Sequence, residues 1–279
     1  MELRGRTVIL TGATGGIGSA LCSELVAAGA RVLAVGRSPH TIGTLAGRFR
    51  EGCVIPAIAD LATEQGRSRL VEIAGNLQPA PSVLVLGHAK SAFGLFEHQA
   101  EEAMESLVRT NVIGPMLLVR GLIPLLRGQP DATVVVIGST FGSLAFPGFA
   151  AYSASKFAMR GLTEALSREY ADTELHFQYL SPRATRTAFN SQAVDALNAE
   201  MKTSVDEPGD VARQLVTAIA QGRGRMQVGW PEKLLVCLNG ILPSLVDRSL
   251  RTRLPVIRHH ANNEHYLAEE IPSHEAHPR

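Results

Sequence analysis

One segment carries the main signal for the fold: Thr7-Val8-Ile9-Leu10-Thr11-Gly12-Ala13-Thr14-Gly15-Gly16-Ile17-Gly18. A short, β-branched apolar run leads into a glycine-rich turn, and apolar residues then recur at helical spacing up to Gly29. A strand, a glycine turn and a helix N-terminus together form a diphosphate site, because glycines let the phosphates approach the backbone and free N–H groups favour an anion. The segment therefore predicts a dinucleotide-binding unit at the start of the chain.

The rest of the chain alternates apolar strands with helical stretches. Further strands are expected at residues 31–35, 53–59, 82–86, 132–137 and 176–180. A long helical stretch is expected over residues 100–126, kinked or shortened by Gly114, Pro115 and Pro124. This alternation predicts an α/β fold with a Rossmann-like, doubly wound, largely parallel sheet and helices on both faces. We expect a single nucleotide-binding domain over residues 1–260.

A tyrosine, a lysine and a serine are spaced so that one carbonyl group could meet all three. Tyr152 and Lys156 lie four residues apart, on one face of a helix, and Ser139 precedes the tyrosine by thirteen residues. An ammonium group one turn from a phenol lowers the phenol pKa toward working pH. The phenol then serves as general acid for an alkoxide or general base for an alcohol. The same spacing is common on ordinary helix surfaces, and the N-terminal glycine turn favours the catalytic interpretation.

These features together resemble the short-chain dehydrogenase/reductase family, in its shorter, dehydrogenase-type form. The resemblance covers roughly residues 4–230, and the glycine turn, Asn111, Ser139, Tyr152 and Lys156 occur in the family's order. It implies that Tyr152 protonates the substrate oxygen while Ser139 holds it. It also implies that Lys156 lowers the tyrosine pKa and binds the nicotinamide ribose. In the family, Asn111 widens its helix locally and maintains a proton relay to Lys156.

The resemblance also implies a set of residues that hold a nicotinamide cofactor. The strand at 31–35 ends in Gly36-Arg37, where an acidic residue would bind the ribose of NAD and an arginine accommodates the 2′-phosphate of NADP. We therefore expect NADP(H) as the cofactor, although Arg37 could also be an ordinary solvated loop residue. The expected cofactor-binding residues are Gly12, Thr14, Gly16, Ile17, Gly18, Arg37, the adenine-contacting pair Asp60 and Leu61, Tyr152, Lys156, and Thr187 at the carboxamide.

Two segments depart from the family pattern. Leu86-Gly87-His88-Ala89 replaces the usual N-N-A-G, which buttresses the sheet near the cofactor ribose. We expect His88 to be a packed, hydrogen-bonded histidine, with a functional role as the alternative. Pro182-Arg183 replaces the usual P-G turn. Arg183 either alters the loop beside the nicotinamide, which is the favoured interpretation, or meets an acidic group on the substrate.

The composition limits the class of protein to which the chain can belong. A chain of 279 residues that is 45% hydrophobic fits one compact enzyme domain, and a net charge of +1 gives no reason to expect nucleic acid. The three cysteines are widely spaced, which favours reduced thiols, and no metal-ligand spacing is visible. We see no signal peptide ahead of the first strand and no apolar run approaching the ~18 residues of a membrane span. We expect a cytoplasmic protein without a metal ion.

The C-terminal third carries the expected substrate side. Residues 183–208 are expected to form a loop, without a strong core, that closes over the substrate. Residues 231–260 combine basic and apolar side chains, so they either lie on a membrane surface or, as we favour, cap the cleft or form a subunit interface. Residues 261–279 are expected to be a disordered tail. Several apolar residues near the catalytic set either line an apolar cleft or pack in the core: Phe141, Leu144, Phe146, Phe149 and Phe189.

These expectations combine into a functional hypothesis. The sequence favours an NADP(H)-dependent oxidoreductase that reduces a carbonyl, or oxidises the alcohol, of an apolar small molecule. The alternative is a catalytically idle NADP-binding sensor or interaction protein on the same fold, which the altered 86–89 segment keeps open. In the family the helices expected from about Ala100 and near Tyr152 pair across a two-fold axis, so a homodimer or homotetramer is expected.

Overall fold

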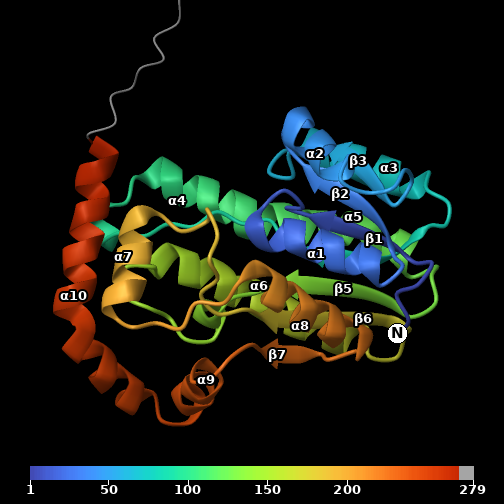
Figure 1. Ribbon diagram of the computed structural model, residues 1–279. Coiled ribbons are helices and arrows are strands. Elements are labelled where there is room, and N and C mark those ends of the chain that lie inside the picture. The colour runs from blue at the N-terminus through green and yellow to red at the C-terminus, as the bar shows by residue number, and fades with distance from the viewer. Residues whose placement is uncertain (270–279) are drawn as a thin grey trace, which may run out of the picture.

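The computed structural model describes residues 1–269, and its strands form a seven-stranded sheet (Figure 1). Every neighbouring pair is parallel, in the order β3-β2-β1-β4-β5-β6-β7. The predicted largely parallel sheet is confirmed, and its order reverses between β1 and β4, which opens a ligand crevice beyond their carboxyl ends. The strands are β1 (Thr7–Thr11), β2 (Arg31–Gly36), β3 (Val54–Ile58), β4 (Pro81–Leu86), β5 (Ala132–Ile137), β6 (Leu175–Ser181) and β7 (Arg225–Gln227).

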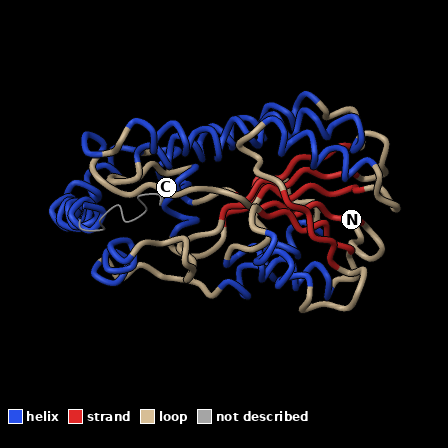
Figure 2. Tube along the Cα trace, turned by 90° about the horizontal axis from the view of Figure 1, so that it is seen from above, coloured by secondary structure: helices blue, strands red, loops and turns tan. Residues whose placement is uncertain are grey.

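Helices cover both faces of the sheet (Figure 2). Because neighbouring residues of a strand point to opposite faces, Leu10 packs with α1, α2 and α8, whereas Ile9 packs with α3, α5 and α6. This two-sided core makes the fold doubly wound, as predicted. The helices are α1 (Gly16–Ala27), α2 (Pro39–Ala46), α3 (Glu64–Gly75), α4 (Glu101–Val108), α5 (Gly114–Leu126), α6 (Ala150–Glu169), α7 (Gln192–Glu200), α8 (Pro208–Ala220), α9 (Glu232–Ile241) and α10 (Pro243–Glu269), with short turns η1 (Phe96–His98), η2 (Arg109–Ile113) and η3 (Thr140–Gly142).

The helix expected over residues 100–126 is continuous but has a wider turn in its middle. The segment η2 is π-helical, joins α4 to α5 and contains Asn111, which agrees with the local widening that the family resemblance implies. Gly114 follows directly, and a side chain there would press into the carbonyl oxygen of Leu61, 2.6 Å from the Cβ position. Pro124 lies inside α5 without ending it, so the expected shortening at Pro124 does not occur.

The same helix, Glu101–Leu126, is the single candidate for a membrane span among the described residues, by length and composition only. The sequence analysis expected no apolar run that approaches the length of a membrane span, and this expectation was therefore too strict. Leu118, Leu122 and Leu126 of this helix are fully buried in the core beside the sheet. The structure thus uses the segment as a core helix of the α/β fold.

Three features of the C-terminal third differ from the sequence expectations. Residues 183–208 are not a coreless loop, because they contain α7, whose Val194 and Leu197 are buried. The edge strand β7 was not foreseen. Residues 261–269 continue α10 as helix instead of starting a disordered tail, and the rest of the expected tail lies outside the described residues. Figure 1 shows α10, in red, along the edge of the molecule beyond α7, and α9 below α7, between β7 and the lower end of α10.

Candidate active site

A cleft of about 1130 Å³ opens at the carboxyl ends of the strands. Its walls come from the turns that follow β1, β2, β3, β4 and β5, from the start of α6 and from the helices α7, α9 and α10. The structure therefore brings together nearly all of the site residues expected from the sequence. Those lining the cleft are Gly12, Thr14, Gly16, Ile17, Gly18, Arg37, Asp60, Leu61, Ser139, Tyr152, Lys156 and Thr187.

The glycine turn leaves no room for a side chain at Gly12 or Gly16, which both line the cleft. Gly12 has a φ of +68°, and a Cβ there would lie 2.7 Å from the backbone of His88. A Cβ on Gly16 would collide with the side chain of Thr187. The turn leads directly into α1, so its backbone N–H groups and the helix N-terminus are available to an anion. This cradle fits the diphosphate of a dinucleotide cofactor.

The three expected catalytic side chains meet in the middle of this cleft. Ser139 follows β5, and its Oγ accepts a hydrogen bond from Phe141 N at 3.1 Å. The Ser139 side chain also hydrogen-bonds Tyr152, at the start of α6. One turn later, Lys156 Nζ lies 5.6 Å from the centre of the Tyr152 ring and donates to the Ile137 carbonyl at 3.1 Å. The sequence spacing thus translates into one cluster of acid, cation and hydroxyl.

The electrostatics of this cluster differ from the sequence expectation. Burial raises the pKa of Tyr152 above its ordinary range, and the hydrogen bond from Ser139 only partly opposes this. Burial also lowers the pKa of Lys156 to about 8. The expected lowering of the Tyr152 pKa by Lys156 is therefore not seen, because desolvation dominates and Lys156 is not among the groups that shift this pKa. In this state Tyr152 is a neutral phenol at pH 7, which is the form that donates a proton.

Asn111 lies behind the cleft and joins three segments through its amide. Its Oδ1 accepts from Lys90 N at 2.7 Å, and its Nδ2 donates to the Lys90 carbonyl at 2.8 Å and to Ser155 Oγ at 3.1 Å. Ser155 in turn donates to the carbonyl of Tyr152. Asn111 therefore fixes the strand-β4 loop against the catalytic helix. No contact of Asn111 with Lys156 is seen among the described residues, so its place in a proton relay stays a prediction.

His88 is packed and hydrogen-bonded, which confirms the interpretation favoured from the sequence. Its Nδ1 lies 2.8 Å from Thr11 Oγ1, and that hydroxyl also bonds Gly87 N and the Val85 carbonyl. Burial, followed by the charge of Lys156, lowers the pKa of His88 to about 4, so the ring is neutral at pH 7. Within the described structure its buried Nε2 has no hydrogen-bond partner. The residue lines the cleft beside the glycine turn.

Arg183 makes a set of bonds that sequence reasoning did not foresee. Its guanidinium binds both carboxylate oxygens of Asp206, at 2.9 and 2.7 Å, as well as the Trp230 carbonyl and Glu232. Only 14–17% of each charged side chain is exposed. The hydrogen bonds to Asp206 raise the pKa of Arg183 beyond its ordinary range. Arg183 is thus committed to holding the substrate loop and α9 together, which agrees with the favoured interpretation over a contact with the substrate.

A further residue, which the sequence analysis did not single out, supports α6, the helix that carries Tyr152 and Lys156. Tyr179, in β6, is fully buried and donates a hydrogen bond to the backbone carbonyl of Lys156 at 3.1 Å. A side chain on Gly138 or Gly142 would collide with its ring. The glycines flanking Ser139 are the sequence signal that could have indicated a close neighbour here.

The wall beside Tyr152 is aromatic. The ring centres of Phe141, Phe149 and Phe189 lie 6.4, 6.3 and 6.0 Å from that of Tyr152. Leu144 and Phe146 also line the cleft. Beyond them, the substrate end is closed by aliphatic side chains from three helices. These are Val194 and Leu197 of α7, Leu235 and Leu238 of α9, and Leu245, Val246 and Leu250 of α10.

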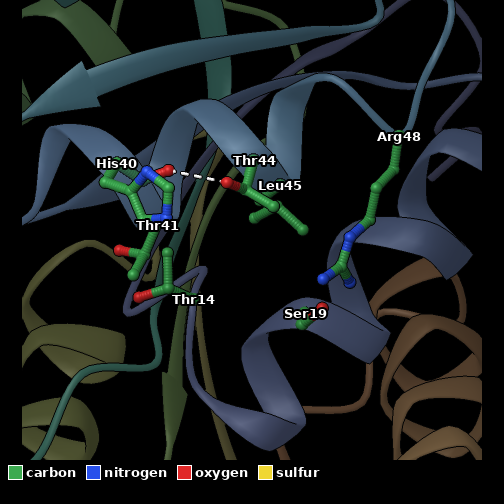
Figure 3. Close-up of a pocket in the computed structure, with 7 residues that line it drawn as sticks. All are labelled: Thr14, Ser19, His40, Thr41, Thr44, Leu45 and Arg48. Carbon is green, nitrogen blue, oxygen red and sulfur yellow. Dashed lines mark hydrogen bonds between the residues drawn. The ribbon is translucent and has the colours of Figure 1, made fainter.

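A second, smaller pocket of about 240 Å³ lies between α1 and α2 (Figure 3). It shares Thr14 with the large cleft. Figure 3 shows the Arg48 guanidinium reaching toward Ser19, and His40 on the opposite side. The lining has two basic side chains, several hydroxyls and no carboxylate: Thr14, Ser19, His40, Thr41, Thr44, Leu45 and Arg48. Its chemistry suits an anion next to the adenosine end of the cleft.

Comparison with known proteins agrees with this architecture. The family model described as short chain dehydrogenase matches residues 6–198. The uncharacterized oxidoreductase YxnA of Bacillus subtilis is 26% identical over 256 residues, 88% of this chain and 72% of its own. Human dehydrogenase/reductase SDR family member 4 is 29% identical over 191 residues, 67% of this chain and 69% of its own.

Solved structures show the same fold with either nicotinamide cofactor. A short-chain dehydrogenase/reductase from Burkholderia phymatum in complex with NAD has a TM-score of 0.78 and 21% identity, covering 88% of this chain and 96% of that one. A short-chain dehydrogenase from Burkholderia cenocepacia in complex with NADP has a TM-score of 0.77 and 18% identity, covering 90% and 99%. With the family match over residues 6–198 and the glycine cradle in place, this chain belongs to the short-chain dehydrogenase/reductase family of oxidoreductases.

Proposed function

We propose that this oxidoreductase is an NADPH-dependent carbonyl reductase for apolar small molecules. The observation that carries the proposal is the convergence of Ser139, Tyr152 and Lys156 on one point of a cleft that has a dinucleotide cradle at one end and apolar walls at the other. A cluster with one proton donor, one cation and one hydroxyl is what the reduction of a carbonyl requires.

The cofactor preference for NADP(H) follows from charge at the adenosine end. No hydrogen bond or ion pair within the described residues occupies the Arg37 guanidinium, and β2 ends without an acidic residue. The neighbouring pocket adds Arg48 and His40. Asp60 and Leu61 would hold the adenine, Thr187 the carboxamide and Lys156 the nicotinamide ribose. An NAD-type site would instead need a carboxylate for the ribose hydroxyls.

The chain's own residues would handle the substrate oxygen. The chemistry that NADPH supplies when bound is a hydride for the carbonyl carbon. Ser139 would hold the oxygen by a hydrogen bond, and Tyr152 would deliver the proton from its phenol. The raised pKa of Tyr152 keeps that proton in place at pH 7, so the protonation state favours reduction over alcohol oxidation. Lys156 is cationic below about pH 8 and would stabilise the phenolate that remains.

The decisive experiment is a panel of ketones, β-keto esters, steroids and long-chain aldehydes with NADPH, run on the wild type and on Tyr152→Phe. We expect turnover of apolar members, and a loss of about 10²–10⁴-fold in kcat for the variant, since general acid catalysis contributes that much. NADPH binding, followed by its fluorescence, should be nearly intact. NADPH binding without turnover of any carbonyl would instead support an idle sensor protein.

We further propose that the protein assembles through α4–α5 and α6. Five large apolar side chains on these helices are about 40% exposed, and they have no role in the core: Val108, Ile113, Met116, Leu117 and Phe157. Closed two-fold assemblies are the commonest for soluble oligomers. Light scattering at micromolar concentration should give a dimer or tetramer, and Met116→Asp with Phe157→Asp should give a monomer. A monomeric wild type would refute this assembly.

A further inference from the structure

The helices α9 and α10 present two different faces. Leu235 and Leu238 of α9 and Leu250 of α10 line the cleft. A flanking face of α9 carries Leu234 and Ile241, which do not line the cleft and are 53% and 71% exposed. The sequence offered a cleft cap and a membrane-facing segment as alternatives. The inner face of α9 and α10 caps the cleft, and their outer face has no partner within the described structure.

Apolar side chains gather on this outer surface around the connection between the two helices. Leu242 is 48% exposed, and Trp230, just before α9, is 66% exposed. Leu245 is 52% exposed but also lines the cleft, so it borders this surface. Leu234 and Ile241 lie seven residues apart, on one face of α9. We call the group of Trp230, Leu234, Ile241 and Leu242 the α9–α10 apolar surface. Contiguous exposed apolar residues of this kind mark a docking site.

The charges beside this surface are basic. Exposed basic residues outnumber exposed acids five to one over residues 230–260, and Glu232 is already paired with Arg183. Arg248 and Arg251 lie three residues apart on α10, on the face opposite to the cleft-lining Val246 and Leu250. The basic residues are Lys233, Arg248, Arg251, Arg253 and Arg258, of which Arg253 also lines the cleft, and the acid is Asp247.

We propose that the α9–α10 apolar surface docks on an anionic lipid membrane. A tryptophan and aliphatic residues would enter the interface, and the flanking arginines and lysine would meet lipid phosphates, as in interfacial amphipathic helices. Charge complementarity disfavours a second copy of the chain, because pairing would bring the same basic residues together. The inference does not depend on the proposed reductase activity. If that activity holds, the docked surface adjoins the cleft walls, where a lipid-soluble substrate would enter.

The test uses the full-length protein and sedimentation with extruded vesicles. We expect binding to vesicles containing 30% phosphatidylglycerol, as a stated probe, and weak binding to pure phosphatidylcholine. Because surface charges are screened within about 8–10 Å at physiological ionic strength, binding should weaken in high salt. Replacing Arg248 and Arg251 by Gln should lower the partition constant about tenfold or more, since each basic residue near an anionic surface contributes roughly fivefold.

The apolar part is tested by Leu234→Asp with Ile241→Asp. Both residues are exposed and lie outside the cleft, so the variant should keep its thermal unfolding temperature and its turnover of a water-soluble ketone while losing vesicle binding. Ile58→Asp, an exposed apolar position at the far edge strand β3, is the matched control and should bind vesicles like the wild type. Wild-type protein that stays in the supernatant with every vesicle overturns the proposal. A change of oligomeric state in Leu234→Asp with Ile241→Asp, without wild-type vesicle binding, would assign the surface to a second copy.

Discussion

The two ends of the cleft are built in different ways. The cofactor end consists of strand termini and glycines, and the strands β1, β4 and β5 behind it are buried at every position. The substrate end consists of helices α7, α9 and α10, which no strand supports. Apolar side chains pack α7 and α10 against the Tyr152 region, and Arg183 ties the loop after α7 and the start of α9 to the end of β6 through two carboxylates. One end therefore gains its shape from backbone geometry, and the other gains it from side-chain packing and a few ion pairs.

Substitutions should therefore act differently at the two ends. A site made from backbone tolerates most nearby side-chain changes but not a Cβ at Gly12, Gly16 or Gly18. The substrate end contains an ion-pair cluster, so the loss of the Arg183 cation alone should change its stability and its substrate binding. Substitutions at each end can therefore show whether cofactor binding and substrate binding respond independently.

The largest effect is expected for Arg183→Leu. The substitution leaves Asp206 and Glu232 largely buried without their cation, and removing one partner of such a pair costs roughly 3–5 kcal/mol. We expect a lower urea midpoint and a higher KM for apolar substrates, with the Kd for NADPH unchanged. Arg186→Leu is the matched control, because its pair with Glu207 is 72% and 59% exposed and contributes less than about 1 kcal/mol. An equal loss of stability in Arg183→Leu and Arg186→Leu would show that the Arg183 ion pairs have no special role at the substrate end.

A smaller effect, confined to the cofactor end, is expected for Arg37→Asp. Hydrogen bonds to charged groups contribute about 1.5–3 kcal/mol, so kcat/KM for NADPH should fall roughly 10- to 100-fold. A carboxylate there also accepts bonds from a ribose diol, so the preference should turn toward NADH. The measurement is kcat/KM for both cofactors in both proteins, with the KM for the carbonyl substrate as control. A wild type that prefers NADH would disprove the assignment of Arg37.

The smallest effect concerns Lys156, where the two ends meet. Its pKa is lowered to about 8, so the side chain is charged below that pH and loses its proton above it. Reductase activity, as kcat/KM for NADPH, should be level near pH 7 and fall about tenfold per unit above pH 8. A profile that stays level through pH 9.5 would show that the cation is unnecessary or that its pKa is higher.

Much of the cofactor end could be predicted because its signals are local. The residues from Thr7 to Gly18 specify a strand, a turn and a helix within twelve positions. Ser139, Tyr152 and Lys156 come together because β5 and α6 are adjacent in the chain and in space. The strand at 53–59 was one residue too long at each end, since β3 covers Val54–Ile58.

The substrate end was less predictable because its contacts are distant in sequence. Nothing near Arg183 indicates that its partners lie 23 and 49 residues away. The strand β7 has three residues and no fully buried side chain, so it lacks an apolar signal. The helix α7 did carry one, with Ser191 as its N-cap and Val194 and Leu197 at helical spacing. The pKa of Tyr152 depended on burial, which spacing alone does not reveal.

The Arg183 cluster also bears on the order in which the molecule is completed during synthesis. The chain through β6 already contains every residue assigned to the diphosphate, the 2′-phosphate and proton transfer. Glu232 leaves the ribosome about fifty residues later, and the loop that it closes with Arg183 spans 49 residues. A nascent chain therefore holds the elements of the nucleotide site and the aromatic wall before α9 and α10 close the substrate chamber. Ribosomes stalled before residue 230 would display a nucleotide site whose substrate chamber still lacks the walls from α9 and α10.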